Sequence, residues 1–327
     1  MTTPSAALLA VALLAAACAS TEDGAAPPST AGGAGSGAKS GTGEAGGKDD
    51  PLLTGQGKSG LYQRIDSLSG SWQRANAEPG EKAALDARAL ETAIAREVWG
   101  ALESVLADLR ASANPRWRST AARGLGFVRD ERIRPALEGV LGETDPRLLS
   151  SALVSLARGA DAATDDRAVV TLLRHPDAVV RGNAALCLAR AFQARRQQGM
   201  EALAAERAAD AEADLSILLF ERDDPIVRGN AAQALGALGS PGAEDALLNL
   251  LRDDAAFVRL KAAQALALCG TPKALPPLLD ALGREGEGNV RTVLALGLGA
   301  VAERRGQAPS YADLGTDAGK WRRFLQR

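Results

Sequence analysis

Apolar residues recur with helical spacing through most of the chain, and the same pattern returns at a nearly fixed interval. The hexapeptide VRGNAA occurs at Val180–Ala185 and again at Val227–Ala232. In each copy the apolar residues fall at positions i, i+4, i+5 and i+8, which form one face of a helix. Weaker copies complete a series of six, which start at Trp117, Leu148, Val180, Val227, Val258 and Val290. The starts are 31, 32, 47, 31 and 32 residues apart, and a regular interval of this size is typical of a solenoid.

A helix start precedes most copies, and a second amphipathic segment follows them. Candidate N-cap residues, three of them directly before a proline, are Asn114, Asp145, Asp177 and Asp224. Segments such as Ala243–Leu251 and Lys273–Leu282 lie between copies and are amphipathic in their turn. Turns rich in Gly and Pro separate the two kinds of segment. Each repeat is therefore expected to be a helix, a turn, a second helix and a turn.

The frame shared by the copies is an Asp, a Val-Arg pair, two small residues and a Leu-Gly pair, and it covers roughly residues 113–305. This frame resembles the short bacterial type of HEAT repeat, which is similar to phycobilisome-lyase repeats. The chain departs from it at Leu149, where the Arg is missing, and at Leu294, where a small residue is missing. The resemblance implies an all-α fold, a right-handed α-solenoid of about six HEAT-like helix pairs. It also implies that the first helices form the outer face, that the second helices form the inner face, and that the protein binds other proteins.

Arginine recurs at one position of the frame. We interpret this series as a structural ladder that reaches acidic residues or helix ends of neighbouring repeats, because its phase is tied to that of the core positions. The ladder consists of Arg118, Arg181, Arg228, Arg259 and Arg291. An anion-binding stripe is the alternative interpretation. Polar residues of the second helices are the candidates for contact with a protein partner, and they are Arg134, Glu138, Arg174, Glu221, Glu244, Asn249, Arg252, Lys273 and Asp280.

Two further segments flank the repeats. We expect residues 61–112 to form an N-terminal helical cap and residues 113–327 to form the solenoid. Within the cap, apolar residues between 82 and 110 fit one long amphipathic helix, and residues 61–77 have the spacing of a further helix. At the other end, Trp321 and Phe324 are expected to close the last repeat, because they are large apolar residues in a chain with only 3% aromatic residues.

The single long interval contains about 15 extra residues around Gln193–Glu212. They are expected to extend the helix pair of the third repeat, with a break at Gly199. The extension is either a passive elongation or an arm that contacts a partner, since insertions on one face of a repeat often bind.

The N-terminus has the features of a secretion signal. Residues 1–17 contain an apolar run that is too short to span a bilayer, which is typical of a signal peptide. The stretch Leu14–Cys18 resembles a bacterial lipobox, which implies cleavage before Cys18 and lipidation of that cysteine. Ala15 occupies the position where a lipobox usually has Leu, and no Lys or Arg precedes the apolar run. A plain secreted protein is the alternative.

Residues 18–60 are mostly Gly, Ala, Ser and Thr with scattered charges, so they are expected to be a disordered tether behind the lipid anchor. The predicted location is the cell envelope, lipid-anchored and extracytoplasmic. Because Ala19 follows the cysteine, the outer membrane is expected where two membranes are present.

Composition excludes several kinds of chemistry. The net charge is −2, which gives no basic field for nucleic acid. His175 is the one histidine, so a di-iron site built on several His-Glu pairs is excluded, and no metal or cofactor is expected. Cys187 and Cys269 lie at helix positions that suit small core residues. The stretch Gly55–Ser59 looks like part of a P-loop, but Leu52 stands where the motif needs a glycine.

We expect no catalytic residue, because paired acids in this chain stand at helix boundaries, where they cap backbone N–H groups. The sequence therefore predicts a non-enzymatic, protein-binding scaffold that holds a protein partner on the concave face of the solenoid. Two alternatives stay open. One is an accessory or regulatory subunit of an envelope enzyme, and the other is a small-ligand binder or lyase-type HEAT enzyme.

Overall fold

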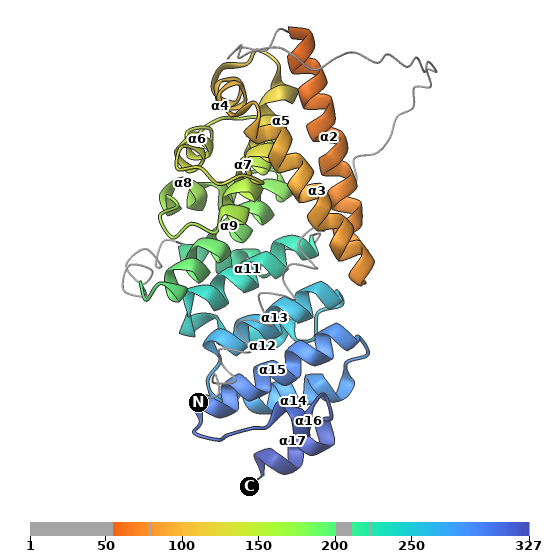
Figure 1. Ribbon diagram of the computed structural model, residues 1–327. Helices are drawn as coiled ribbons and strands as arrows, with labels where there is room; N and C mark the ends of the chain where they lie inside the picture. Colours follow the sequence, from red (N-terminus) through yellow and green to blue (C-terminus); the bar gives the residue numbers. More distant parts are fainter. Residues whose placement is uncertain (1–54, 79, 201–210, 223, 327) are drawn as a thin grey trace.

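The computed structural model describes residues 55–78, 80–200, 211–222 and 224–326, and the regular structure in these ranges is helical, with no strand. The helices are stacked as successive pairs into an elongated solenoid (Figure 1). The all-α solenoid expected from the repeats is therefore confirmed. The expected signal peptide, Cys18 and most of the expected tether lie outside the described residues.

The longer helix of each pair carries the repeated Val-Arg frame, and we call these helices the VR helices. They are α5 (Pro115–Leu125), α7 (Pro146–Gly159), α9 (Ala178–Gln197), α11 (Pro225–Leu238), α13 (Ala256–Cys269) and α15 (Gly288–Arg304). The expected N-caps are confirmed, because the side chains of all four accept hydrogen bonds from backbone N–H groups of the first turn.

A shorter helical segment follows each VR helix. These short helices are α6 (Ile133–Glu138), α8 (Asp166–Thr171), a helix at 211–218, α12 (Glu244–Leu250), α14 (Leu275–Arg284), and α16 (Tyr311–Leu314) with α17 (Ala318–Leu325). Single 3₁₀ turns extend three of these segments, at η1 (Leu172–Arg174), η2 (Pro241–Ala243) and η3 (Pro272–Ala274).

Glycine and alanine let successive VR helices approach closely. A Cβ atom placed on Gly236 of α11 would lie 2.4 Å from the Cα of Ala265 on α13. At the same position of the frame, a Cβ on Gly126 would lie 2.6 Å from Ser155 Oγ on α7. Real Cβ atoms do not make such contacts, so glycine is required at these two positions, where one repeat packs on the next.

The two helices of each repeat pack in different ways. Each VR helix packs directly on the next, from α5 through to α15. Among the described short helices, α6 does not pack closely on α8, nor α12 on α14. A bent stack is compressed on its inner side, so the closely packed VR helices line the concave face and the short helices the convex face. We assign the faces on this packing, and the assignment is opposite to the expectation that the second helices form the inner face.

Three helices precede the first repeat: α2 (Gly55–Ala77), α3 (Glu81–Trp99) and α4 (Leu102–Ala111). The single long helix expected over 82–110 is broken, since Ala101 has the non-helical angles φ −132° and ψ 24°. Helix α2 begins at Gly55, inside the segment expected to be tether.

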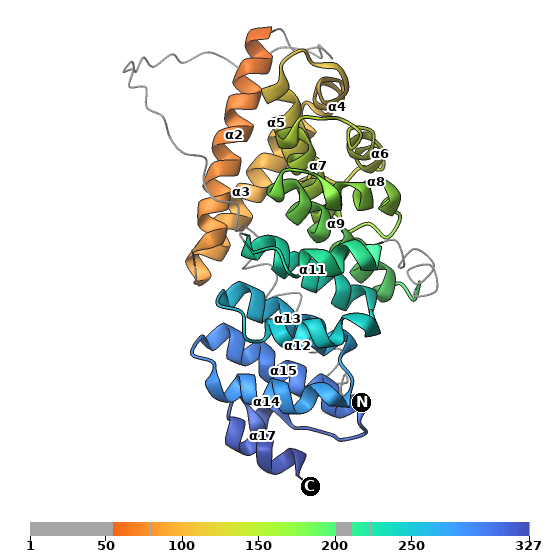
Figure 2. The same ribbon diagram turned by 180° about the vertical axis from the view of Figure 1, so that it is seen from behind.

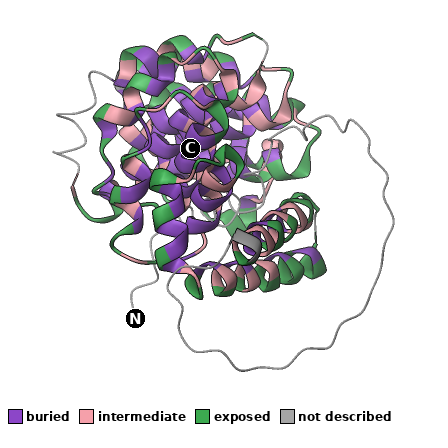
Figure 3. Ribbon diagram, turned by 90° about the horizontal axis from the view of Figure 1, so that it is seen from above, coloured by how far each residue is buried: buried purple, intermediate pink, exposed green. Residues whose placement is uncertain are grey.

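Helices α2 and α3 form a hairpin that runs along one side of the stacked repeats (Figures 1 and 2). Seen from above, along the stack, this hairpin lies beside the repeats, whose interior is buried (Figure 3). Its contacts with the solenoid are made mainly through α5, the first VR helix.

The extra residues of the third repeat lengthen its VR helix. Helix α9 has 20 residues, whereas α11 has 14. Its added turns are anchored by Arg195, whose buried guanidinium binds the carboxylate of Asp166 and the carbonyl oxygens of Ala162 and Thr164. The helix ends two residues before Gly199, which has φ +69°. Residues 201–210 lie outside the described residues, so the choice between a passive extension and a contact arm stays a prediction.

The C-terminal segment packs on the last repeat. Trp321 is buried, and its indole N–H donates to the carbonyl oxygen of Gly315 at 2.9 Å. Its ring meets Phe324 edge to face, and α17 packs on α14. These contacts close the end of the stack. Among the described helices, none is both long and apolar enough to span a bilayer.

Candidate functional site

The repeated hexapeptide VRGNAA connects neighbouring repeats through its asparagine. In α9, Asn183 donates its side-chain amide to Ser150 Oγ of α7 at 2.7 Å. In α11, Asn230 donates to the carbonyl oxygen of Gly182 at 3.0 Å. Each bond joins a VR helix to the preceding one. The hexapeptide is thus duplicated because the same junction is built twice.

The arginines of the frame form ion pairs at the edge of the stack. Arg228 of α11 binds Asp253 through two hydrogen bonds of 2.9 Å, and Arg259 of α13 binds Glu285 at 2.8 and 2.9 Å. Arg118 and Arg181 make equivalent ion pairs with Glu143 and Glu221. The carboxylate in each of these pairs follows the arginine by roughly one repeat.

The fifth arginine of the series, Arg291, donates to backbone carbonyl oxygens instead, including that of Thr316 at 2.7 Å. The hydrogen bond from Arg118 lowers the pKa of Glu143, and the hydrogen bond from Arg259 lowers the pKa of Glu285. With its donors occupied in this way, the series links one repeat to the next.

Most residues expected to contact a partner form ion pairs or hydrogen bonds with other residues of this chain. Arg134 pairs with Asp161 and with Glu138, and Glu138 also accepts from the backbone N–H of Asp165. Arg174 binds Asp214 at 2.9 Å. These contacts lie on the convex side and cross from one repeat to the next.

The fourth and fifth repeats repeat this arrangement. Glu244 is buried and accepts from both the backbone N–H and the hydroxyl of Thr271, and Lys273 pairs with Asp245. Glu221 is the partner of Arg181. Three candidates remain whose side chains are exposed and have no side-chain partner within the described residues, and they are Asn249, Arg252 and Asp280.

The structure therefore does not gather the nine candidates into one surface. The spacing of these residues could have revealed their contacts, because Arg134 and Asp161 are 27 positions apart, as are Glu244 and Thr271. Oppositely charged or hydrogen-bonding residues that are separated by nearly one repeat are expected to lie side by side.

The N-terminal hairpin makes a polar contact with the first VR helix. Asp66 of α2 accepts hydrogen bonds from Arg116 at 2.9 and 3.1 Å and from the hydroxyl of Thr120 at 2.7 Å. Arg123 lies 3.4 Å from the same carboxylate. These three residues of α5 are spaced four and three positions apart, so they lie on one stripe of the helix. One carboxylate of α2 thus binds a whole stripe of α5.

Two more residues of α2 fix the hairpin at its upper end. The ring of Tyr62 stacks on Trp117 with the ring centroids 5.4 Å apart. Its hydroxyl donates to Asp108 at 2.9 Å, and burial, followed by the charge of Asp108, raises the pKa of Tyr62. Lys58 donates to the same carboxylate at 2.8 Å. Lys58 belongs to the stretch that looked like a P-loop, and it serves here as a partner of Asp108.

Arg158 of α7 holds the lower part of the hairpin. Its guanidinium lies 4.5 Å from the ring centroid of Trp72 and 4.1 Å from that of Phe127. It also donates to Glu91 of α3 at 3.2 Å. This stacked cation connects α2, α3 and the first two VR helices.

The next part of the same stripe is accessible. Arg147 of α7 stands 31 positions after Arg116 and is exposed, and within the described part of the chain its side chain has no ion pair. Val154, at the position of Arg123, is half-buried, and Val179 at the start of α9 is 51% exposed. We call this surface, made of Arg147, Val154 and Val179, the α7–α9 face.

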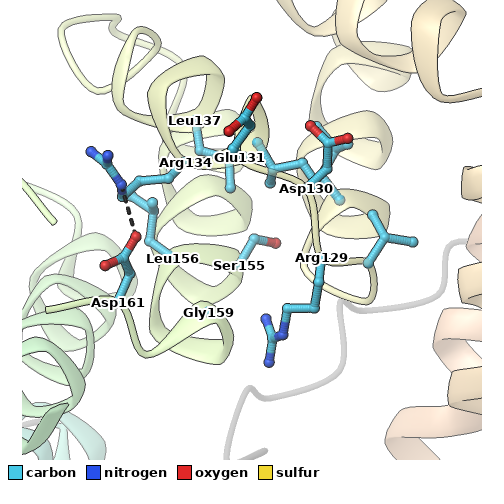
Figure 4. Close-up of a pocket in the computed structure, with 12 residues that line it drawn as sticks. Arg129, Asp130, Glu131, Arg134, Leu137, Ser155, Leu156, Gly159 and Asp161 are labelled. Carbon is cyan, nitrogen blue, oxygen red and sulfur yellow. Dashed lines mark ion pairs between the residues drawn. The ribbon is translucent and has the colours of Figure 1, made fainter. Parts of the chain in front are cut away.

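A pocket of about 390 Å³ lies between the first two repeats (Figure 4). Its floor includes Leu137 and Leu156, and Arg134 points across it toward Asp161. Ser155 also lines it, but its hydroxyl donates to the carbonyl oxygen of Ala122 at 2.7 Å. Among the lining residues there is no histidine or lysine that would act as a general base for this serine.

Residues of catalytic type elsewhere have structural surroundings. Both cysteines of the repeats are free thiols; burial raises the pKa of Cys187, and it raises that of Cys269 to about 11. Such thiols are protonated near neutral pH and are weak nucleophiles. His175 accepts a hydrogen bond at Nδ1 from the backbone N–H of Asp177. Within the described ranges, no group of three or more His, Cys, Asp or Glu residues is arranged to hold a metal ion.

The chain is similar to several solved structures. The complex of CpcE and CpcF of phycocyanin lyase from Nostoc sp. PCC7120 is 18% identical, with 88% of this chain and 99% of that chain covered and a TM-score of 0.45. An engineered protein is 24% identical over 61% of this chain and 97% of its own, with a TM-score of 0.46. A designed armadillo repeat protein in complex with the peptide (KR)4 is 17% identical over 74% of this chain and 99% of its own, with a TM-score of 0.42.

None of the curated proteins matches the chain. The family profile described as HEAT repeats matches residues 102–189 and 212–299, which together make up more than half of the sequence. The matched ranges contain four of the VR helices in full, most of α9 and α15, and the four arginine–carboxylate pairs described above, whereas α16 and α17 lie outside them. The chain therefore belongs to the HEAT-repeat family.

Proposed function

We propose that this protein is a non-enzymatic scaffold that binds a protein partner on the concave face of its solenoid. The observation that carries the proposal is the contrast between the two faces. On the convex side, polar residues such as Arg134 and Glu244 are engaged between repeats. On the concave side, the α7–α9 face offers an arginine without an ion pair in the described residues, next to the half-buried Val154 and the exposed Val179. An accessible apolar surface with a polar rim is typical of a protein-binding site.

The proposal includes a membrane anchor. The lipobox-like stretch before Cys18 and the Gly- and Ala-rich residues that follow support a lipid-anchored protein of the bacterial cell envelope. A coil of roughly 35 residues between Cys18 and α2 would have an r.m.s. span on the order of 35 Å. The solenoid would then be held near the membrane but clear of the lipid headgroups, at the outer membrane where two membranes are present.

The experiment compares the native protein with its Cys18→Ser variant in the cells that produce it. We expect the native protein in the membrane fraction and the variant in the soluble fraction, with one dominant partner recovered after crosslinking of the native protein. Release of both proteins into the soluble fraction would contradict the anchor. The absence of any crosslinked protein in both samples would contradict the scaffold.

A further inference from the structure

The N-terminal hairpin shows what kind of segment this solenoid binds. Helix α2 is not one of the repeats, yet it lies on the first VR helix and is held there by side chains of α5. The residues that it places on the repeats are Tyr62, Asp66 and Trp72. Tyr62 and Asp66 are four positions apart and lie on one side of the helix, and Trp72 contacts Phe127 and Arg158 further along it. A helix with one carboxylate between two aromatic rings is therefore a segment that this surface already accommodates.

The α7–α9 face repeats the surface that α2 occupies. Residues at equivalent positions of successive repeats point the same way, because each repeat is one structural unit stacked on the next. Arg147 on α7 corresponds to Arg116 on α5, which binds Asp66. Val154 on α7 corresponds to Arg123 on α5. Val179 on α9 occupies the position that Arg147 has on α7 and Arg116 on α5. The surface thus continues from the hairpin contact with less charge and more apolar area.

The hairpin itself leaves this continuation accessible. Trp72 and Glu91 of the hairpin contact Arg158, at the C-terminal end of α7. Arg147 lies at the opposite end of that helix and is exposed, and Val179 is 51% exposed. The α7–α9 face is therefore contiguous with an interface that the protein already uses, but it is not covered by that interface.

We propose that the α7–α9 face binds an amphipathic helix of a partner protein that presents a carboxylate on its binding side, in the manner in which α5 binds Asp66 of α2. A carboxylate of the partner helix pairs with Arg147, and apolar or aromatic residues on the same side of that helix pack on Val154 and Val179. This proposal rests on the proposed scaffold function, and it specifies the chemistry of the partner.

The test uses a defined probe, the synthetic peptide with the sequence of α2, residues 55–77, carrying a fluorophore. It is titrated against the full chain by fluorescence anisotropy at low ionic strength. The peptide does not compete effectively for the site on α5, because the attached α2 has an effective concentration in the millimolar range. We expect saturable binding that weakens as salt is added.

Charge-swapped variants test whether Asp66 of the peptide pairs with Arg147. We expect Arg147→Glu to weaken peptide binding by about fivefold or more, and Arg167→Glu to leave it unchanged, since Arg167 is an exposed arginine of the convex helix α8. A peptide with Asp66→Lys is expected to bind the native chain weakly and to regain affinity for the Arg147→Glu variant. Circular dichroism of both protein variants checks that each keeps the helical content of the native chain.

Equal binding of the two peptides to all three proteins would overturn the proposal, and so would a loss of binding with Arg167→Glu that matches the loss with Arg147→Glu. The scaffold function has a separate readout. If the peptides fail to discriminate while the native protein still crosslinks to one partner at the membrane, the partner chemistry proposed here is wrong and the scaffold function stands. If the peptides discriminate but no partner is crosslinked, the scaffold function is the part that fails.

Discussion

The two sides of the solenoid are held together by different forces. On the concave side, VR helices such as α11 and α13 approach until Gly236 touches the backbone of Ala265. On the convex side and along the edge, repeats are joined by ion pairs, which range from the partly buried pair of Arg259 with Glu285 to the exposed pair of Lys273 with Asp245. Close packing tolerates almost no change of shape, whereas exposed ion pairs contribute little each and are easily exchanged. The contrast explains why small residues recur so strictly in the VR helices while the charged residues of the short helices vary from repeat to repeat.

The largest loss of stability is expected from breaking a buried ion pair. Arg195 of α9 and Asp166 of α8 are both buried, unlike the ion pairs at the edge. Asp166→Ala would leave the guanidinium buried without its counter-ion, so we expect it to lower the free energy of unfolding by about 3–5 kcal/mol. Urea denaturation followed by circular dichroism measures the loss.

Asp245→Ala is the matched control, because its pair with Lys273 is exposed on both sides. We expect this change to cost less than about 1 kcal/mol. Equal losses for Asp166→Ala and Asp245→Ala would contradict the distinction between the buried pair and the edge pairs.

The next largest effect is expected from crowding the VR helices. Gly236→Val places a branched side chain against Ala265, and we expect it to lower the free energy of unfolding by about 1–3 kcal/mol. Thermal unfolding of this variant is compared with that of Gly142→Ala, since a Cβ on Gly142 has no neighbour within 4 Å. A Gly236→Val variant as stable as the native protein would show that the concave side is not closely packed.

A smaller and more local effect is expected at the hairpin. Arg158→Met removes the cation that stacks on Trp72 and Phe127 and pairs with Glu91. We expect about 1–2 kcal/mol less protection of the α2–α3 hairpin and no change in α13 and α15. Hydrogen exchange measured by mass spectrometry reports both regions in one experiment.

Arg88→Met serves as the control for Arg158→Met, because Arg88 is an exposed residue of the same hairpin and has no side-chain partner within the described residues. A faster exchange that spreads over the whole stack in Arg158→Met would mean that the hairpin is not a separate stability unit.

The smallest effect is expected at the edge, and it depends on pH. Arg259 lowers the pKa of Glu285 below its ordinary value of 4.5. A carboxylate whose pKa is lower in the folded state stabilises the protein above the ordinary pKa, and that contribution is lost as the pH falls through the folded-state value. We therefore expect Glu285→Gln to cost about 1 kcal/mol or less at pH 7. The difference from the native protein should shrink below about pH 4.5. A difference that grows on acidification would contradict the ion pair.

The fold was predictable because each copy of the repeat has the same pattern of apolar, small and N-capping residues. The spacing of apolar residues gave the VR helices, and N-cap residues such as Asp145 and Asp224 gave their starts. The break at Ala101 was missed because the apolar spacing runs on across Gly100, so nothing in the pattern marks the change of direction. The start of α2 at Gly55 was missed because its first residues are rich in glycine, which is unfavourable in helices.

The candidate site was harder to predict because it depends on which helix layer faces inward. The pattern of buried positions in a helix pair is the same whichever way the stack of pairs curves. The expected inner and outer faces were therefore assigned from the family resemblance. The candidates on the second helices, for example Arg134 and Glu244, then proved to be bound within the protein. The accessible surface lies instead at Arg147 and Val179, and their register with Arg116 has meaning only once α2 is seen on α5.

The most direct test of this account compares two exposed apolar positions on opposite faces. Val179 on α9 belongs to the concave side and is 51% exposed, and Ile217 in the helix at 211–218 belongs to the convex side and is 69% exposed. A photoreactive amino acid is introduced at each position in the membrane-attached protein, and the crosslinked species are compared. The account predicts a discrete crosslinked partner from position 179 and none from position 217. The same partner captured from position 217, with nothing captured from position 179, would contradict it.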